Sequence, residues 1–446
     1  MFNRTNIIRL RNWANEKDRK PLVLRGARQT GKTTLIDIFA KDFDQYIYLN
    51  LEKEKESKLF DGSFSIPQLL DAIFYLKDVD KNKGSTLLFI DEIQNNPNAV
   101  ATLRYFYEEA KDLFVVAAGS LLETLIDKTI SFPVGRVDYM PVRPCSFIEY
   151  LSALGETSSL EIILSGQVPD YAHDKLSELF RTYTIIGGMP EIINEYCKSR
   201  DMNRLKQIYE RLIVSYQDDV EKYAQNQTMA RVIRHIIGSA FQYAGTRITF
   251  EKFGQSTYRS REMSEAFRTL EKTMLLQLEY PVSKTRLPIE EKLRLSPKLL
   301  MLDTGLVNYS SGIQKEMVIS NLIDEVYKGK IAEHIAGQEL LALKPSVRSK
   351  LNFWVPKNPN AQAELDYVWP WEDMLIPIEV KSGATGSLRS LHRFVDEAPH
   401  SWAVRIYTGK YKIEDIATIK GKKFKLINLP YYLVGQIDKI LKANIA

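Results

Sequence analysis

The stretch Gly26-Ala-Arg-Gln-Thr-Gly31-Lys32-Thr33 matches the pattern G-x-x-x-x-G-K-[ST] at every fixed position. The apolar run 21–25 precedes it and predicts a short buried strand, whereas residues 34–40 follow it and predict a helix. A strand, a glycine loop and a helix N-terminus in this order direct several backbone N–H groups at one anion. The stretch therefore predicts a site for the phosphates of a nucleotide, built on a parallel sheet.

Each position of this loop has an expected role. Lys32 should reach the β- and γ-phosphates of ATP, and the hydroxyl of Thr33 should hold Mg²⁺. A chance match in a turn rich in Gly and Thr is the alternative, which the flanking strand and helix oppose. The residues expected to contact the nucleotide are Gly26, Ala27, Arg28, Gln29, Thr30, Gly31, Lys32, Thr33, Thr34 and Ser120.

A second apolar run, residues 86–90, ends in Asp91 and Glu92. Such a run suits a strand buried on both faces of a parallel sheet, and ligands gather at the carboxyl ends of these strands. We therefore expect Asp91 to hold Mg²⁺ through water and Glu92 to polarise the water that attacks the γ-phosphate. The alternative is an ordinary acidic pair at a strand end.

Two further residues are candidates for the same site. Residues 113–118 predict the next parallel strand, and Ser120 follows its carboxyl end, where it could touch the γ-phosphate or cap a helix. Arg136 could act as an arginine finger, in cis or from a neighbouring subunit, or it could be a surface arginine.

Composition bounds the class of protein. The 446 residues are enough for roughly two to four domains. A net charge of +5, from 61 basic and 56 acidic residues, permits contact with nucleic acid without demanding it. The scarce cysteines, Cys145 and Cys197, fit a reducing compartment. Without an apolar run of membrane-spanning length or a signal-peptide pattern, a cytoplasmic protein with no membrane segment is expected.

Residues 145–204 are mostly helical by pattern, and Ile-Ile-Gly-Gly-Met-Pro-Glu at 185–191 interrupts them. Gly187 and Gly188 allow positive φ or a close approach of backbones, and Pro190 starts a new helix. This segment is either a hinge that responds to nucleotide or a plain corner between helices, and the corner is slightly favoured.

Residues 205–310 predict a helix-turn-helix with a wing. Helices are expected over 230–243, 249–254 and 261–276, followed by alternating strands at 276–281 and 293–296. A winged helix can bind DNA through its second helix or only pack against other domains, and both alternatives stay open.

The last segment carries acidic residues in a strand pattern. Glu333 lies on a predicted helix, Glu364 and Asp366 share one face of a strand at 363–369, and Glu379 and Lys381 share one face of the next strand, 375–383. Strands are also expected at 353–355 and 401–407. Carboxylates on neighbouring strands can bind Mg²⁺, although a salt-bridged surface pair gives the same pattern. A lysine cluster follows, either a solvated face or a track for phosphates: Lys410, Lys412, Lys420, Lys422, Lys423 and Lys425.

These motifs resemble a known group. The phosphate loop, Leu-Phe-Ile-Asp-Glu-Ile-Gln at 88–94, Ala-Gly-Ser at 118–120, Gly-Arg at 135–136 and Pro-Cys-Ser-Phe-Ile-Glu-Tyr at 144–150 look like prokaryotic AAA-type ATPases with a C-terminal DUF4143 domain. The last segment is similar to the PD-(D/E)xK nuclease core. That resemblance implies Asp366 and Glu379 as metal ligands, Glu333 as a helix carboxylate that completes the metal site, and Lys381 as the catalytic lysine. Glu-Leu at 364–365 replaces the usual Pro, and many members of this superfamily have lost cleavage.

The sequence as a whole predicts an α/β protein with four parts. These are an ATPase core at 1–144, a helical lid at 145–204, a winged-helix-like domain at 205–310 and a nuclease-like α/β domain at 311–446. The expected activity is Mg²⁺-dependent ATP binding and hydrolysis, coupled to DNA binding or processing by the last domain. The alternatives are a nucleotide-controlled signalling or scaffold switch and a DNA-binding regulator without nuclease activity. The oligomeric state cannot be predicted from this sequence.

Overall fold

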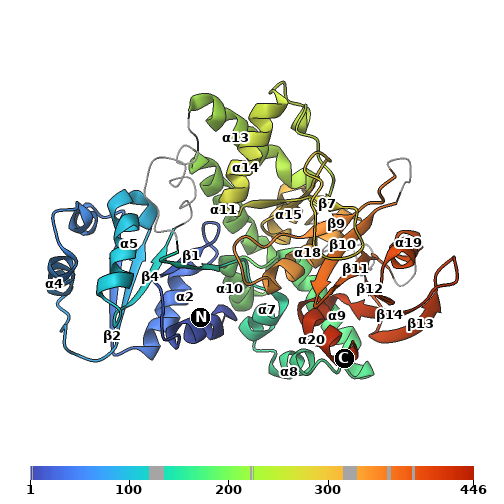
Figure 1. Cartoon of the computed structure of the whole chain (residues 1–446), viewed down its shortest axis with the longest axis horizontal. Coiled ribbons are helices and arrows are strands. Elements are labelled where there is room, and N and C mark those ends of the chain that lie inside the picture. The colour runs from blue at the N-terminus through green and yellow to red at the C-terminus, as the bar shows by residue number, and fades with distance from the viewer. Residues whose placement is uncertain are drawn as a thin grey trace.

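The computed structural model describes residues 2, 4–119, 135–220, 224, 226–314, 329–358, 363–383 and 387–445. Figure 1 shows a parallel sheet at one end of the molecule (blue), a largely helical middle (green and yellow) and a second sheet at the other end (orange and red). None of the helices in these ranges is long and apolar enough to cross a membrane.

The N-terminal sheet has the strand order β2-β3-β4-β1-β5, and all of its printed pairings are parallel. Its strands are β1 (Leu22–Arg25), β2 (Gln45–Asn50), β3 (Thr86–Asp91), β4 (Phe114–Ala118) and β5 (Asp138–Pro141). The helices of this part are α1 (Asn6–Ala14), α2 (Lys32–Phe39), α3 (Glu54–Ser57), α4 (Ile66–Leu76) and α5 (Pro97–Glu109). Separate apolar cores pack against the sheet, as expected for a P-loop NTPase fold.

The middle of the chain is built from helices and a short antiparallel sheet. The helices are α7 (Phe147–Leu154), α8 (Thr157–Ser165), α9 (His173–Ile186), α10 (Pro190–Ser199), α11 (Leu205–Asp218), α13 (Gln227–Ser239), α14 (Ser260–Lys272) and α15 (Thr304–Ser310). The sheet pairs β6 (Leu276–Glu279) with β8 (Lys298–Met301).

One predicted helix in this region is wrong. Residues 249–254 form turns, followed by a single 3-10 turn at Phe253–Gln255. Lys252 and Gly254 have φ values of 55° and 58°, which an α-helix cannot contain. The expected strand at 293–296 is also absent, and β8 begins at Lys298 instead. The winged-helix assignment of 205–310 therefore stays a prediction.

The second sheet has the order β13-β14-β12-β11-β10-β9-β7. Its strands are β7 (Pro281–Val282), β9 (Asn352–Trp354), β10 (Leu365–Trp371), β11 (Met374–Val380), β12 (Trp402–Tyr407), β13 (Lys412–Ala417) and β14 (Lys423–Pro430). Helices α18 (Lys330–Leu343), α19 (Arg389–Glu397) and α20 (Ile437–Asn444) belong to this part of the chain. The strands expected near 353, 363, 375 and 401 are therefore all present.

The middle and the C-terminal part are joined by packing. Strand β7 comes from the middle of the chain but pairs in parallel with β9 of the second sheet. One apolar core also runs from Cys145 to Leu441. The boundaries at 204/205 and 310/311 remain predictions, because a common core crosses both of them.

Candidate nucleotide site and acidic cluster

The glycine loop connects β1 to α2. Strand β1 ends at Arg25, and α2 begins at Lys32 directly after Gly31, whose φ is 86°. A Cβ atom at Gly26 would lie 2.2 Å from the backbone oxygen of Val142, so only glycine fits there. The loop therefore has the strand–loop–helix setting that the motif predicts.

Lys32 is folded back into its own loop. Its Nζ donates to the backbone oxygens of Gly26 and Ala27, at 3.0 Å each. Burial lowers the pKa of Lys32 to about 8, although the nearby carboxylates of Glu92 and Asp91 oppose this shift. The loop thus holds a buried ammonium group that an incoming phosphate can attract.

Thr33 and Asp91 meet as the sequence predicts. The Thr33 hydroxyl donates to Oδ2 of Asp91 at 2.8 Å, and the Tyr48 hydroxyl donates to the same oxygen at 3.3 Å. Burial raises the pKa of Asp91, and the Thr33 hydrogen bond opposes this effect. An aspartate and a threonine hydroxyl at hydrogen-bond distance form an oxygen pair of the kind that Mg²⁺ prefers.

Glu92 follows β3 in a strained backbone conformation. Its φ is 52°, in the left-handed region, and its backbone N–H donates to Oδ1 of Asp91 at 3.0 Å. The amide of Gln94 donates to the carboxylate of Glu92. The turn after β3 therefore turns Glu92 away from the strand, and the side chain lines the same cleft as Lys32.

A cleft lies above the loop, and Lys32, Asp91 and Glu92 line one side of it. Its second wall comes from α10 and α11, where Pro190, Glu191, Asn194, Lys198 and Arg211 line it. The segment at 185–191 is therefore a corner between helices and also a wall of the nucleotide cleft. Sequence reasoning did not identify the last three of these residues, since the only local signal was the Gly-Gly-Met-Pro-Glu break just before them.

Other contacts tie the loop to the helices. Arg28 donates to Oδ1 of Asp219, at 2.7 Å, and its backbone oxygen accepts from the Tyr216 hydroxyl at 3.2 Å. Arg4 forms a buried ion pair with Glu149 at 3.1 Å and donates to the backbone oxygen of Thr30. These contacts therefore couple the position of the loop to the positions of α7 and α11.

One predicted site residue, Arg136, is not brought to the loop. Arg136 pairs with Glu108 at 3.2 Å and lies just before β5, whose first residue, Asp138, is beside Leu22 at the start of β1. The loop follows the other end of β1, so this chain holds Arg136 at the opposite edge of its own sheet. A role in trans remains a prediction. Ser120 lies outside the described residues.

The predicted acidic residues of the second sheet do come together, but around a lysine that the sequence analysis missed. Nζ of Lys298 lies 2.8 Å from Glu333, 2.9 Å from Glu364 and 3.7 Å from Asp366. Lys381 pairs with Glu379 at 2.6 Å. No sequence signal distinguished Lys298, because it lies in the preceding part of the chain and outside any motif.

The electrostatics of this cluster are those of crowded, buried carboxylates. Burial, followed by the negative charge of Asp366, raises the pKa of Glu333 and of Glu379. Burial disfavours the charged form of Lys298 and acts to lower its pKa. The carboxylates of Glu333, Asp366 and Glu364 outweigh this effect and raise the pKa of Lys298. Oε2 of Glu379 is buried without a hydrogen-bond partner among the described residues.

The cluster does not have the geometry of a metal site. Within the described ranges, no group of three or more His, Cys, Asp or Glu side chains is arranged to hold a metal ion. Of the residues that the resemblance assigns to Mg²⁺, Glu333 and Asp366 pair with Lys298 and Glu379 pairs with Lys381, so in this conformation they do not fit a metal ion.

Three of the six lysines in the C-terminal cluster, Lys410, Lys412 and Lys422, are occupied by internal contacts. Lys410 pairs with Asp170 at 2.8 Å, and Lys412 pairs with Glu414 at 2.9 Å. Nζ of Lys422 donates to the backbone oxygens of Val395, Ala398 and His400. These contacts favour a structural role over a phosphate track.

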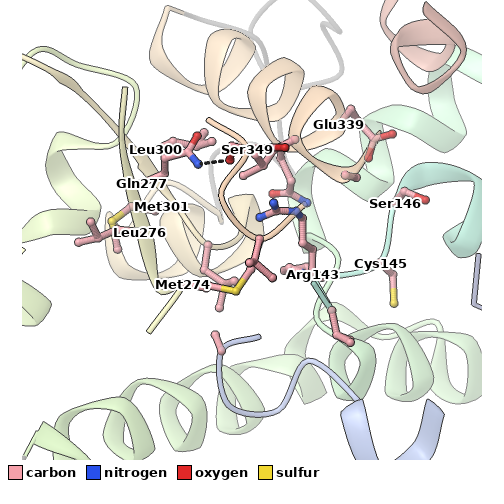
Figure 2. Close-up of a pocket in the computed structure, with 18 of the residues that line it drawn as sticks. Arg143, Cys145, Ser146, Met274, Leu276, Gln277, Leu300, Met301, Glu339 and Ser349 are labelled. Atoms are coloured by element: carbon pink, nitrogen blue, oxygen red, sulfur yellow. Dashed lines mark hydrogen bonds between the residues drawn. The ribbon is translucent and has the colours of Figure 1, made fainter. Parts of the chain in front are cut away.

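A second cavity lies where the ATPase part, the helical middle and the C-terminal part of the chain meet. Figure 2 shows its lining, with Arg143 from the end of the ATPase part, Met274 and Met301 from the middle, and Glu339 from α18. It is separate from the nucleotide cleft, although Ala27 of the loop contributes to its wall. The cavity marks the junction through which the parts contact one another.

Comparison with known proteins agrees with this arrangement. A family model described as an AAA domain matches residues 18–151, a domain of unknown function (DUF8612) matches 177–317, and another (DUF4143) matches 328–432. No curated protein sequence matches this chain.

Several solved structures are similar. The Walker-type ATPase paby2304 of Pyrococcus abyssi is 15% identical with a TM-score of 0.46, over 70% of this chain and 96% of that one. The ORC1 protein of Aeropyrum pernix, solved in complex with DNA, is 12% identical with a TM-score of 0.26, over 72% and 95%. Drosophila ORC bound to DNA is 13% identical with a TM-score of 0.28, over 69% and 94%.

The family matches and the loop geometry point to the same assignment. The AAA match covers the phosphate loop and β3, and the fold it describes supports nucleotide binding and hydrolysis. The chain therefore carries an AAA-type P-loop ATPase domain and, on its C-terminal side, a DUF4143 domain.

Proposed function

We propose that this protein binds Mg²⁺-ATP in the cleft above the loop at 26–33 and hydrolyses it, and that the helices lining the cleft transmit the nucleotide state. The observation that supports this most directly is the meeting of Lys32, Thr33, Asp91 and Glu92 in one cleft. The hydrogen bond from Thr33 to Asp91 couples the two oxygen groups on which Mg²⁺ binding would depend.

Each residue of the cleft has a separate proposed role in hydrolysis. Thr33 and Asp91 would hold Mg²⁺, which, when bound, offsets the negative charge of the phosphates. Lys32 would exchange the carbonyls of Gly26 and Ala27 for phosphate oxygens. Glu92, oriented by Gln94, would accept a hydrogen bond from the attacking water and take up its proton as the water oxygen bonds to the γ-phosphorus. The bond from the γ-phosphorus to the bridging oxygen breaks in the same displacement, and that oxygen leaves with ADP.

The test is the variant Glu92→Gln, which keeps the shape of the side chain but cannot take up a proton. ATP affinity should stay near the wild-type value, while turnover should fall about 100-fold or more. Glu108→Gln is a matched control, because Glu108 lies with Arg136 at the opposite edge of the sheet. Turnover of Glu92→Gln equal to that of the wild type would remove Glu92 from the reaction.

A second function, nucleic-acid binding, is favoured by a basic groove beside the acidic cluster. Four cations, Arg247, Lys292, Arg294 and Lys357, line the groove together with two carboxylates, Glu291 and Glu364, and the exposed Leu293. Cations spaced along a groove suit a phosphate backbone, and a nearby apolar side chain can contact a base or sugar.

This second function is tested by gel shift with a salt titration. Replacing both Lys292 and Arg294 with Ala should weaken DNA binding and reduce the salt slope by about 2, because about one counterion is released per phosphate contact. Replacing Lys420 and Lys423, which lie on or beside β14, removes the same charge elsewhere and should have little effect. Equal losses in both double variants would place binding outside the groove.

A further inference from the structure

The position of Lys298 is unusual for a lysine. It is the first residue of β8, it is only 3% exposed, and its ammonium group contacts carboxylates that follow it in the chain. Those carboxylates come from α18 (Glu333), from the residue just before β10 (Glu364) and from β10 itself (Asp366). The ammonium group of Lys298 therefore lies between carboxylates that come from separate elements of the fold.

The surroundings fix Lys298 in this place. It lies opposite Glu279 in the pairing of β6 with β8, and it forms an isolated bridge with Arg247. Its Nζ lies 5.1 Å from the centre of the Phe353 ring. A buried ammonium group without its carboxylates would be strongly unfavourable, so these ion pairs hold the ammonium group of Lys298 in the cluster.

The remaining carboxylates are also engaged. Val380 donates its backbone N–H to Oδ2 of Asp366 at 2.7 Å, and Lys381 binds Oε1 of Glu379. Arg247 reaches Glu364 at 3.4 Å from the solvent side. The cluster is thus held together by side-chain cations from two parts of the chain, although Oε2 of Glu379 is buried without a hydrogen-bond partner among the described residues.

We propose that Lys298 is the built-in cation of this acidic cluster: it takes the place of a divalent metal ion, so that the cluster binds no such ion and cleaves no nucleic acid while β8 holds Lys298 there. A divalent ion bound by Asp366 and Glu333 would lie close to Nζ of Lys298, and two like charges in one buried site repel strongly. The proposal is independent of ATP hydrolysis, which uses another site.

The prediction for a variant follows from the charge count. Five carboxyl groups (Glu279, Glu333, Glu364, Asp366 and Glu379) face three cations (Lys298, Lys381 and Arg247). Lys298→Met keeps an unbranched side chain that is one atom shorter but removes one cation, which leaves more uncompensated negative charge on oxygen ligands. Because hard divalent cations bind such oxygen ligands, the variant should gain a metal site.

The experiment measures Mn²⁺ binding to the full chain without nucleotide, by electron paramagnetic resonance. The wild type should show no Mn²⁺ that depends on Asp366, whereas Lys298→Met should bind about one ion more per chain. The double variant Lys298→Met/Asp366→Asn should lose that ion. Lys350→Met is the matched control. It removes a lysine outside the cluster, whose Nζ lies 2.9 Å from Oε1 of Glu271, and this variant should gain no Mn²⁺.

Each outcome decides the proposal. A folded Lys298→Met that gains no Mn²⁺ overturns it, and so does a wild type whose Mn²⁺ binding is abolished by Asp366→Asn. That second comparison needs only wild type and Asp366→Asn, so it still decides if Lys298→Met fails to fold. Mn²⁺-dependent cleavage of DNA by the wild type that Lys381→Ala abolishes also overturns the proposal, whereas the same cleavage confined to Lys298→Met supports it.

Discussion

Gly188 donates its backbone N–H to Oδ2 of Asp303 at 2.5 Å, and this hydrogen bond links the wall of the nucleotide cleft to the segment that carries Lys298. Gly188 is two residues before Pro190, which lies over the loop, where a Cβ at Gly31 would be 3.4 Å from its ring. Asp303 follows β8 and caps α15 by accepting from the backbone N–H of Leu306 at 3.1 Å. One short stretch of chain therefore contacts the segment just before the cleft wall at one end and the acidic cluster at the other.

The first prediction concerns this hydrogen bond. Asp303→Ala should lower the free energy of unfolding by about 3 kcal/mol, because it leaves the buried N–H groups of Gly188 and Leu306 without a charged acceptor. Urea unfolding followed by circular dichroism measures the loss. Asp201→Ala is the control, since Asp201 caps a short helix nearer the surface by accepting from the Asn203 N–H, and its loss should be about 1 kcal/mol. Equal losses would mean that Asp303 is an ordinary cap.

The second prediction concerns the loop lysine. Lys32→Ala should weaken ATP binding roughly 10- to 100-fold, since a charged hydrogen bond to phosphate contributes about 1.5–3 kcal/mol. Titration with a fluorescent ATP analogue measures the affinity, and Lys41→Ala, an exposed lysine just after α2, serves as the control. If Lys32→Ala bound ATP as tightly as the wild type, the loop would not be the phosphate site.

The third prediction is a pH dependence of ATP binding. Because the pKa of Lys32 is lowered to about 8 in the free protein, the ammonium group loses its proton above that pH. Phosphate binds the protonated form, so the apparent affinity should fall up to about tenfold for each pH unit above 8. Calorimetric titrations at pH 7, 8 and 9 test this. The arginine of Lys32→Arg stays charged between pH 7 and 9. The ATP affinity that this variant retains should therefore not fall with pH as the wild-type affinity does.

The fourth prediction concerns Glu339, which is buried beside the cavity in Figure 2. Its Oε1 accepts from the Tyr183 hydroxyl at 2.8 Å and from the Phe147 N–H at 3.1 Å. Burial raises the pKa of Glu339 from 4.5 to about 7. A raised carboxyl pKa favours the protonated form in the folded state, so stability is full below pH 4.5 and falls as the pH rises toward 7, by about 3 kcal/mol in all.

Glu339→Gln should remove that loss, because its amide oxygen accepts both hydrogen bonds without carrying a charge. The variant should melt at a higher temperature than the wild type at pH 8 and at nearly the same temperature at pH 4. Differential scanning calorimetry at both pH values measures this. A variant that is less stable than the wild type at pH 8 would show that the charged form of Glu339 is needed.

Local sequence was sufficient for the nucleotide site. The loop at 26–33, the strand ending at Asp91 and the strand at 114–118 were all predicted, because glycine spacing and buried apolar runs are properties of adjacent residues. The strands that carry Asp366 and Glu379 were predicted for the same reason. The helix expected at 249–254 failed because Lys252 and Gly254 take left-handed conformations, which pattern and propensity do not report.

The sequence by itself determined an α/β ATPase core and the residues that would meet the phosphates and the magnesium ion, since those residues are fixed by short-range chain geometry. Only the tertiary structure decided which distant groups join them. Arg211 reaches the cleft from α11, Arg136 is held at the far edge of the sheet, and Lys298 is placed among the carboxylates of a sheet more than thirty residues further on. Such contacts depend on how separate elements pack, because a buried charge takes the partners that the surrounding core brings to it.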